Sequence, residues 1–188
     1  MSFNVNKIIT AGGGGAIVIN NEEMFSEQKL RLLLNVNKKN NGYDYYGVGY
    51  NYRINPLNSA LGYSQLDRID EILETKNNIL KYYTEFLGDY VEFQETTKDS
   101  VSNNWFVAIK LKSKKEKNKV YEQLIKNQME VKENYTPAHR IDWVIADGFS
   151  TDCKNSDDLF DKSLLLPCGP SFSFEDIKLI CDTIKGVL

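Results

Sequence analysis

The sequence predicts an α/β protein in which one long helical region precedes a small mixed layer of strands and helices. Apolar residues recur at intervals of three and four between residues 57 and 87, a spacing typical of amphipathic helices. Strand-like runs follow at residues 90–95, 105–112 and 129–132, and a helical pattern at residues 116–127 separates the last two. The order strand, strand, helix, strand favours a small α/β layer domain.

The composition is that of a soluble globular protein. The 188 residues are 41% hydrophobic and 26% charged, which is enough apolar material for a core. The net charge of -3 gives no reason to expect binding to nucleic acid or to an anionic membrane. No apolar run is long enough to cross a bilayer and no signal peptide is evident, so we expect a cytoplasmic protein. The three cysteines lack metal-like spacing, which indicates packing residues in a reducing compartment and no metal site.

The first fifty residues combine loops with two short regular elements. Four glycines lead into a β-branched run at residues 16–20, which predicts a strand leaving a tight turn. A helix is expected from residue 22 to about residue 35, followed by a loop over residues 35–42. The motif-bearing segment at residues 2–15 has no strand or helix before it to support it. We therefore expect that a preceding part of the fold is missing.

The second half ends in a well-signalled helix. Gly88 is expected to end the long helical region. The irregular segment at residues 133–155 contains the only histidine, His139, and is longer than most connections, which indicates a functional or mobile loop. Ser173 is expected to cap the last helix, because Glu175 and Asp176 follow it and suit the positive end of the helix dipole.

Lys7 is the residue whose surroundings indicate chemistry. It lies among small polar residues just before glycines that allow a ligand to approach the backbone closely. A lysine amine attacks a carbonyl only when it is uncharged, and Ile8 and Ile9 can provide the shielding that favours that form. The alternative is that Lys7 is a solvated surface residue and the glycines form a flexible turn. Neither nucleotide fingerprint fits, since no helix is expected to follow the glycines and no Gly-Lys-Ser/Thr is present.

Three blocks of sequence resemble one known family. Ser-Phe-Asn-Val-Asn-Lys-Ile-Ile-Thr at positions 2–10, followed by the glycines, resembles the cofactor-lysine segment of the DegT family of sugar aminotransferases, which depend on pyridoxal 5′-phosphate. Gly-Tyr-Asn-Tyr-Arg at 49–53 resembles the next block, and Leu-Pro at 166–167 with the acidic final helix resembles the ending. The resemblance implies the C-terminal portion of a fold type I (aspartate aminotransferase-like) transferase. Residues 1–55 would belong to the large cofactor-binding domain, 56–88 to a connecting helical region, and 89–188 to a small C-terminal α/β domain.

The resemblance also implies roles for residues near the cofactor. Lys7 would be the catalytic residue, which anchors the cofactor and then moves a proton as an acid and base. Ser2 would contact the cofactor phosphate, and Asn51 would reach the phosphate in the neighbouring subunit, which makes a homodimer part of the site. Ala11 departs from the pattern, since many relatives carry threonine there.

Three further residues are expected to bind the substrate by the same resemblance. Arg53 is suited to the phosphates of a sugar nucleotide, although an ion pair that braces the long helix is an equal alternative. Tyr135 and His139 lie in a segment similar to the Pro-Leu-His loop of the family, while a structural role for a single histidine stays open. The usual arginine-proline at the start of that loop is replaced by Lys132 and Glu133.

The implied activity is transfer of an amino group to a keto-sugar nucleotide, with glutamate as the expected donor, in the synthesis of amino sugars and surface polysaccharides. The family's front half supplies an aspartate for the pyridine nitrogen and an aromatic residue that stacks on the ring, and this sequence contains neither block. We therefore expect little activity from the chain alone, and pairing as a homodimer or with a separate N-terminal half. The alternatives are a non-catalytic remnant that serves as a dimerising module, and an unrelated α/β domain whose glycine turn binds phosphate.

Overall fold

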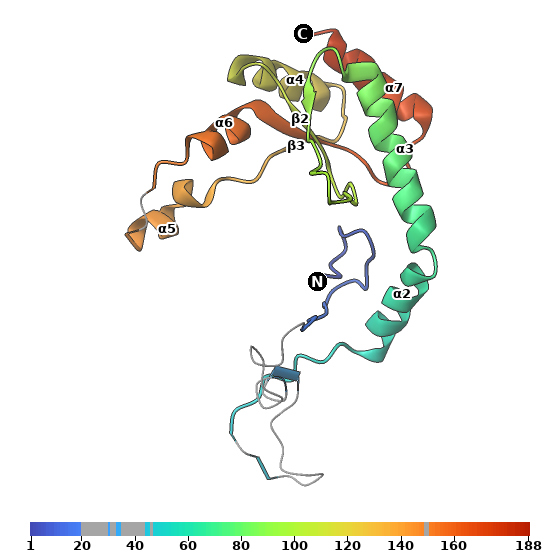
Figure 1. Ribbon diagram of the computed structural model, residues 1–188, viewed down its shortest axis with the longest axis vertical. Coiled ribbons are helices and arrows are strands. Elements are labelled where there is room, and N and C mark those ends of the chain that lie inside the picture. Colours follow the sequence, from blue (N-terminus) through green and yellow to red (C-terminus); the bar gives the residue numbers. More distant parts are fainter. Residues whose placement is uncertain (20–29, 31–32, 35–43, 46, 149–150) are drawn as a thin grey trace. The chain divides into compact units, whose positions relative to one another are not determined.

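The computed structural model describes residues 1–19, 30, 33–34, 44–45, 47–148 and 151–188. The chain divides into two compact units, Met1–Ile69 and Asp70–Leu188, each of which is described by itself (Figure 1). The helix predicted at residues 22–35 and the loop predicted at residues 35–42 fall almost entirely outside the described residues. The three-part division of the chain expected from the sequence stays a prediction.

The described residues of the Met1–Ile69 unit include an N-terminal loop, an exposed segment and the helix α2 (Pro56–Leu66). The side chain of Asn55 caps α2 by accepting a hydrogen bond from the backbone N–H of Asn58 at 2.9 Å. The strand predicted at residues 16–20 is wrong for the part described, because no strand is assigned at residues 16–19 and, within the described residues, only Ala16 exchanges backbone hydrogen bonds with another segment, at Met1. A β-branched run forms a strand only beside a partner, and Ile17 and Val18 are 55% and 64% exposed here.

The long helical region is confirmed, with an interruption. It consists of α2 and α3 (Ile69–Leu87), which are separated by Asp67 and Arg68. Along α3, Ile79, Tyr83 and Leu87 are buried at intervals of four residues, as expected for one face of an amphipathic helix. The helix ends immediately before Gly88, where a Cβ atom would lie 2.7 Å from the carbonyl oxygen of Thr84.

A four-stranded antiparallel sheet forms the centre of the Asp70–Leu188 unit. The strands are β1 (Glu92–Phe93), β2 (Val107–Lys110), β3 (Lys132–Glu133) and β4 (Ser163–Leu166), in the order β1-β2-β4-β3. The three predicted strand runs correspond to β1, β2 and, displaced by a few residues, β3. The central strand β4 was not predicted, because Ser-Leu-Leu-Leu is buried on both sides and lacks the alternation that marks a half-exposed strand.

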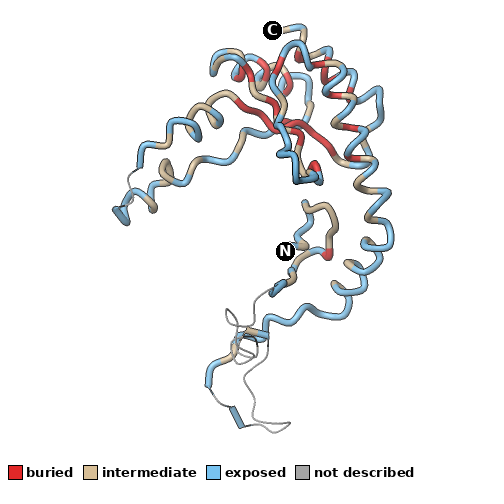
Figure 2. Tube along the Cα trace, viewed as in Figure 1, coloured by how far each residue is buried: buried red, intermediate tan, exposed pale blue. Residues whose placement is uncertain are grey.

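Three helices cover one face of this sheet: α3, α4 (Lys114–Lys126) and α7 (Phe174–Lys185). The core between them and the sheet includes Ile109 and Leu164, and the buried segments shown in red in Figure 2 gather there. As predicted, Ser173 caps α7, and it forms a reciprocal capping box with Asp176. Within the segment predicted to be irregular lie the short helices η1 (Ala138–Arg140) and α5 (Asp142–Ala146), and α6 (Lys154–Lys162) begins at its end.

Candidate functional site

The segment that carries Lys7 is a closed loop held by its own backbone. The N–H of Phe3 donates to the carbonyl of Gly14 at 3.0 Å, and the N–H of Ala11 donates to the carbonyl of Phe3 at 2.9 Å. Ser2 and Gly15 form an antiparallel bridge at the base of the loop. Lys7 lies near the far end, where its N–H donates to the carbonyl of Asn4 at 3.0 Å and closes a turn. The loop therefore presents Lys7 on a defined backbone.

Three of the four glycines, Gly12, Gly14 and Gly15, are required by the geometry of this loop, Gly12 through its φ of +73°. Gly15 lies so close to the opposite strand of the loop that a Cβ atom would be 2.4 Å from the carbonyl oxygen of Met1. Gly14 has a φ of +85°, a conformation that side-chain-bearing residues rarely adopt. Gly13, by contrast, has open space around it. The glycine run thus shapes the backbone around Lys7. It is more constrained than the flexible turn that the sequence left as an alternative.

Side-chain hydrogen bonds connect this loop to the start of α2. The carbonyl of the fully buried Ala11 accepts a hydrogen bond from the side-chain amide of Asn58, which belongs to the first turn of α2. The hydroxyl of Thr10 accepts from the N–H of Gly12 at 2.9 Å. A Cβ atom at Gly62 would lie 3.3 Å from the methyl group of Ala11, so the small residue at position 11 matches a small residue on the helix.

The other predicted cofactor-site residues are exposed and close to backbone turns. Ser2 accepts a hydrogen bond on its Oγ from the N–H of Asn4 at 3.4 Å. Asn51 has a φ of 54°, which asparagine tolerates better than most residues. Its Oδ1 accepts a hydrogen bond from Nε of Arg53 at 2.9 Å, so the structure brings these two predicted residues together.

Tyr135 and His139 belong to the other unit, in the segment that follows β3. Tyr135 is 63% exposed. The side chain of His139 is only 16% exposed, and its Nε2 lies 2.9 Å from Oδ1 of Asp157 on α6. His139 therefore has a structural partner, while its predicted contact with substrate stays a proposal.

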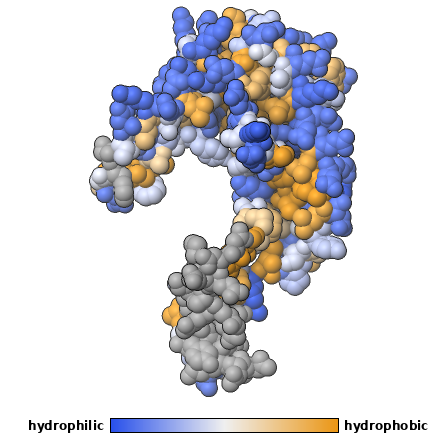
Figure 3. Space-filling model, viewed as in Figure 1, coloured by the Kyte–Doolittle hydropathy of each residue, from blue (hydrophilic) through white to orange (hydrophobic). Residues whose placement is uncertain are grey.

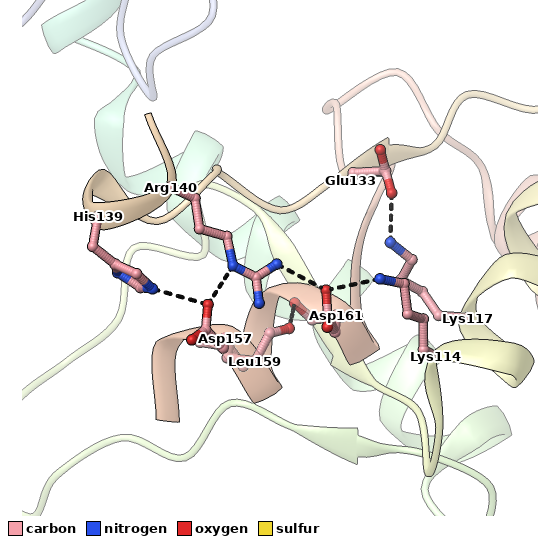
Figure 4. A network of polar contacts seen from close by, with 9 residues as sticks. Lys114, Lys117, Glu133, His139, Arg140, Asp157, Leu159 and Asp161 are labelled. Carbon is pink, nitrogen blue, oxygen red and sulfur yellow. Dashed lines mark hydrogen bonds and ion pairs between the residues drawn. The ribbon is translucent and has the colours of Figure 1, made fainter. Parts of the chain in front are cut away.

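The sequence reasoning missed a network of ionic contacts around His139 (Figure 4). Arg140 contacts Asp157 through Nε, and its Nη1 donates to Oδ1 of Asp161 at 3.1 Å. Asp161 also contacts Nζ of Lys114 on α4 at 3.3 Å. The hydrogen bond from Arg140 is the main reason that the pKa of Asp161 lies below its usual value. The spacing of Asp157 and Asp161, four residues apart in a helix, was the available signal for this network.

The cysteines and the acidic residues show no metal chemistry in the described part of the chain. Among the described residues, no group of three or more histidine, cysteine, aspartate or glutamate side chains is placed to hold a metal ion. Cys168 and Cys181 are buried, and burial raises the pKa of Cys181 to about 12.

Of the helices that the structure describes, none has the length and apolar character needed to cross a membrane.

Comparison with known proteins decides what kind of protein this is. Residues 1–185 match the DegT/DnrJ/EryC1/StrS aminotransferase family. The chain belongs to this family. The resemblance of the three sequence blocks is thereby confirmed, and the family assignment covers nearly the entire chain.

Two curated relatives illustrate the family's chemistry. A UDP-4-amino-4,6-dideoxy-N-acetyl-beta-L-altrosamine transaminase from Campylobacter jejuni is 28% identical over 205 residues, which cover all of this chain and 51% of the relative. GDP-perosamine synthase from Escherichia coli O157:H7 is 26% identical over 141 residues, covering 73% of this chain and 37% of the relative. This chain therefore spans about half the length, or less, of these relatives.

Solved structures confirm the predicted fold. PseC from Helicobacter pylori, an aminotransferase involved in the biosynthesis of pseudoaminic acid, has a TM-score of 0.87 at 22% identity, covering 98% of this chain and 51% of PseC. The PLP form of the sugar aminotransferase Spr1654 from Streptococcus pneumoniae has a TM-score of 0.84 at 23% identity, covering 99% and 50%. The chain thus has the fold of one part of a type I PLP-dependent aminotransferase.

Proposed function

We propose that this chain supplies the cofactor-lysine part of a PLP-dependent aminotransferase that acts on sugar nucleotides. The observation that carries the proposal is the position of Lys7 near the end of a closed glycine loop, within a family match that begins at residue 1. A closed loop fixes where the amine can be, which is what a covalent cofactor site needs. A lysine that served only as a solvated surface residue would not need a fixed backbone.

The side chains of the Met1–Ile69 unit fit the cofactor by their chemistry. Lys7 would provide the amine for the cofactor's carbonyl and Ser2 a hydroxyl for its phosphate, while Asn51 would provide an amide for the phosphate of the cofactor in the neighbouring subunit. When bound, pyridoxal 5′-phosphate supplies an electron sink that stabilises negative charge on the amino-bearing carbon. Lys7 would then accept a proton from that carbon as a base and return it to the cofactor's own carbon as an acid.

The proposed substrate is a keto-sugar nucleotide, and the proposed amino donor is glutamate. The names of the relatives describe proteins that act on UDP-linked and GDP-linked amino sugars, which supports this class without selecting one nucleotide. Arg53 is proposed to contact the substrate phosphates, because a guanidinium binds phosphate through two parallel hydrogen bonds. Tyr135 and His139 are proposed to contact the substrate. The proposed setting is the cytoplasmic synthesis of surface polysaccharides.

The complete site is proposed to need more polypeptide than this chain. Relatives are about twice as long, and the Met1–Ile69 unit exposes apolar residues that a neighbour would cover, among them Ile17, Val18, Leu57 and Leu66. Figure 3 shows hydrophobic surface, in orange, in the region of α2. The proposed partner is the complementary half of the family fold, in the same polypeptide or a separate one, within a homodimer.

The proposal is tested by following the absorbance of the chain with pyridoxal 5′-phosphate, alone and with the front half of the Campylobacter relative. A borohydride-reducible band is expected that disappears in Lys7→Ala and persists in the control Lys98→Ala, which changes an exposed lysine in the other unit. A band that requires the added front half supports a site shared between the two halves. If no Lys7-dependent band forms in either condition, the chain is a non-catalytic module of the family.

A further inference from the structure

A cavity of about 590 Å³ lies within the Asp70–Leu188 unit, on the face of the sheet opposite α3, α4 and α7. Ala108 of β2 and Leu165 of β4 are directly paired in the sheet, and both line the cavity. The alternating neighbours Val107 and Leu166, which are also paired, belong to the core on the other face and do not line the cavity. The volume falls in the range of about 300–1,000 Å³ that is usual for small-molecule sites.

Aromatic side chains line one wall of this cavity. The rings of Trp105 and Phe106 lie 4.2 Å apart, and those of Phe106 and Tyr135 lie 6.4 Å apart. Tyr135 is 63% exposed, so its ring retains surface on which a flat ligand can stack. Stacking on aromatic side chains contributes about 1–3 kcal/mol per nucleic-acid base and tolerates different bases.

Polar groups of the lining retain hydrogen-bonding capacity. Oδ1 of Asn103 accepts from the N–H of Trp105 at 3.1 Å, which leaves the amide nitrogen of Asn103 as a donor. Oγ of Ser102 accepts from the N–H of Asn104 at 3.1 Å, which leaves its hydroxyl proton available. The exposed amide of Gln94 adds both a donor and an acceptor. These groups suit the edge of a heterocyclic base.

The charges at the cavity already neutralise one another. Nζ of Lys110 lies 3.1 Å from Asp158 and 3.8 Å from Glu92, so the lysine in the lining is balanced by carboxylates. A phosphate placed there would compete with two carboxylates for one cation. The chemistry therefore favours an uncharged ligand over an anionic one.

The wall that carries Tyr135 is held in place at two points. The side-chain amide of Asn134 donates to Oγ of Ser163 at 2.9 Å, beside the pairing of β3 with β4. Further along, Arg140 is bound by Asp157 and Asp161 on α6 (Figure 4). A wall fixed in this way loses little freedom when a ligand binds, which favours affinity.

We propose that this cavity binds the base of a nucleoside, stacked on Tyr135 and the neighbouring aromatic rings. The inference deepens the proposed function and rests on it, because sugar nucleotides carry such a base. Trp105, Phe106, Ala108 and Asn103 then become determinants of which nucleotide is preferred, a role that the resemblance of the sequence blocks assigns to none of them.

The test uses the fluorescence of Trp105 in the chain carrying Trp143→Phe, which removes the only other tryptophan. Uridine, thymidine, guanosine and glucose are titrated separately, without pyridoxal phosphate. Saturable quenching by at least one nucleoside is expected, and Tyr135→Ala should weaken it about ten-fold. Tyr63→Ala is the matched control, because Tyr63 is 69% exposed and belongs to the other unit.

A second variant, Ala108→Leu, fills the base of the cavity without removing an aromatic ring and should weaken binding by a similar factor. Thermal melts establish that each variant is folded. No saturable quenching by any nucleoside, equal quenching by glucose, or equal loss in Tyr63→Ala would overturn the proposal. Because these titrations contain no pyridoxal phosphate, failure here is distinct from failure of the cofactor test.

Discussion

The Asp70–Leu188 unit has a continuous core of buried aliphatic and aromatic side chains, whereas in the Met1–Ile69 unit Ala11 is the only buried hydrophobic residue among those described. Figure 2 shows the same contrast in the distribution of its red segments. The loop that carries Lys7 is held instead by backbone hydrogen bonds and by glycines that allow close approach. The proposed chemistry thus lies in the unit with less internal packing, and the packed unit provides the stable frame.

This difference has a thermodynamic consequence. Burial of apolar surface is the main favourable contribution to folding, so the free energy of unfolding should depend mostly on side chains of the second unit. Hydrogen bonds of an exposed loop contribute little to global stability because water competes for them. Equivalent substitutions in the two units should therefore have very different effects.

The largest effect is expected from truncating the core. Leu164, on the central strand β4, is fully buried, and Leu164→Ala should lower the free energy of unfolding by about 2–5 kcal/mol. Leu57→Ala, at a leucine that is 85% exposed on α2, should change it by less than about 0.5 kcal/mol. Urea unfolding followed by circular dichroism measures both. Similar losses in the two variants would show that the first unit has a core of its own.

A smaller effect is expected from one buried hydroxyl. The hydroxyl of Tyr83 donates to the carbonyl of Pro167 at 2.9 Å, and burial raises the pKa of this tyrosine. Tyr83→Phe keeps the ring but leaves that buried carbonyl without its donor, which should cost about 1–2 kcal/mol in the same urea assay. Tyr90→Phe removes a hydroxyl from a tyrosine that is 44% exposed and should cost much less. Equal costs would mean that water replaces the hydroxyl at Pro167.

The sequence predicted the elements whose patterns arise from one-sided burial. The helical region around Tyr83 and the capped final helix were recognised because their apolar residues repeat along one face. Strand β4 was missed because both of its sides are buried. The strand expected at residues 16–20 does not form over residues 16–19, where the β-branched side chains are exposed. Patterns show which residues avoid water, but they do not show what a strand pairs with.

The candidate site divides in the same way. Lys7 and its glycines were found through local sequence, because the backbone conformation they need is encoded by neighbouring residues. The contact of Asn51 with Arg53 is also local. The partners of His139 and Arg140 lie on α6, and the cavity beside Tyr135 is assembled from β1, β2, β4 and the segment that follows β3. Such sites depend on tertiary contacts that a single sequence does not display.

The loop around Lys7 gives a direct way to separate local from global effects. Gly15→Ala places a methyl group against the carbonyl of Met1 and should open the loop, which should abolish the Lys7-dependent absorbance band. The free energy of unfolding in urea should change by less than about 0.5 kcal/mol, because the core is untouched. Gly13→Ala has open space and serves as the matched control. Loss of the band in both variants would show that glycine flexibility, rather than close approach at Gly15, is what matters.

The smallest effect is expected from the ionic network on the surface of the second unit. The pKa of Asp161 lies below its ordinary value of 3.8, first because of the hydrogen bond from Arg140. A lowered folded-state pKa means that the ionised carboxylate is favoured by folding. Its stabilisation is therefore complete above the ordinary pKa and is lost as the pH falls through the folded-state value.

Asp161→Asn should accordingly lower the urea midpoint slightly at pH 7, and the difference from the parent chain should shrink below about pH 4. The hydrogen-bonded pair with Arg140 can be isolated by repeating the substitution in an Arg140→Gln background, where the pH-dependent part should largely disappear. If the difference were instead constant across the acid range, Asp161 would act through packing against α4 and η1 rather than through its charge. The contribution of Asp161 to the stability of the second unit would then be independent of pH, as that of the apolar core is. The two units would differ even more in how they are stabilised.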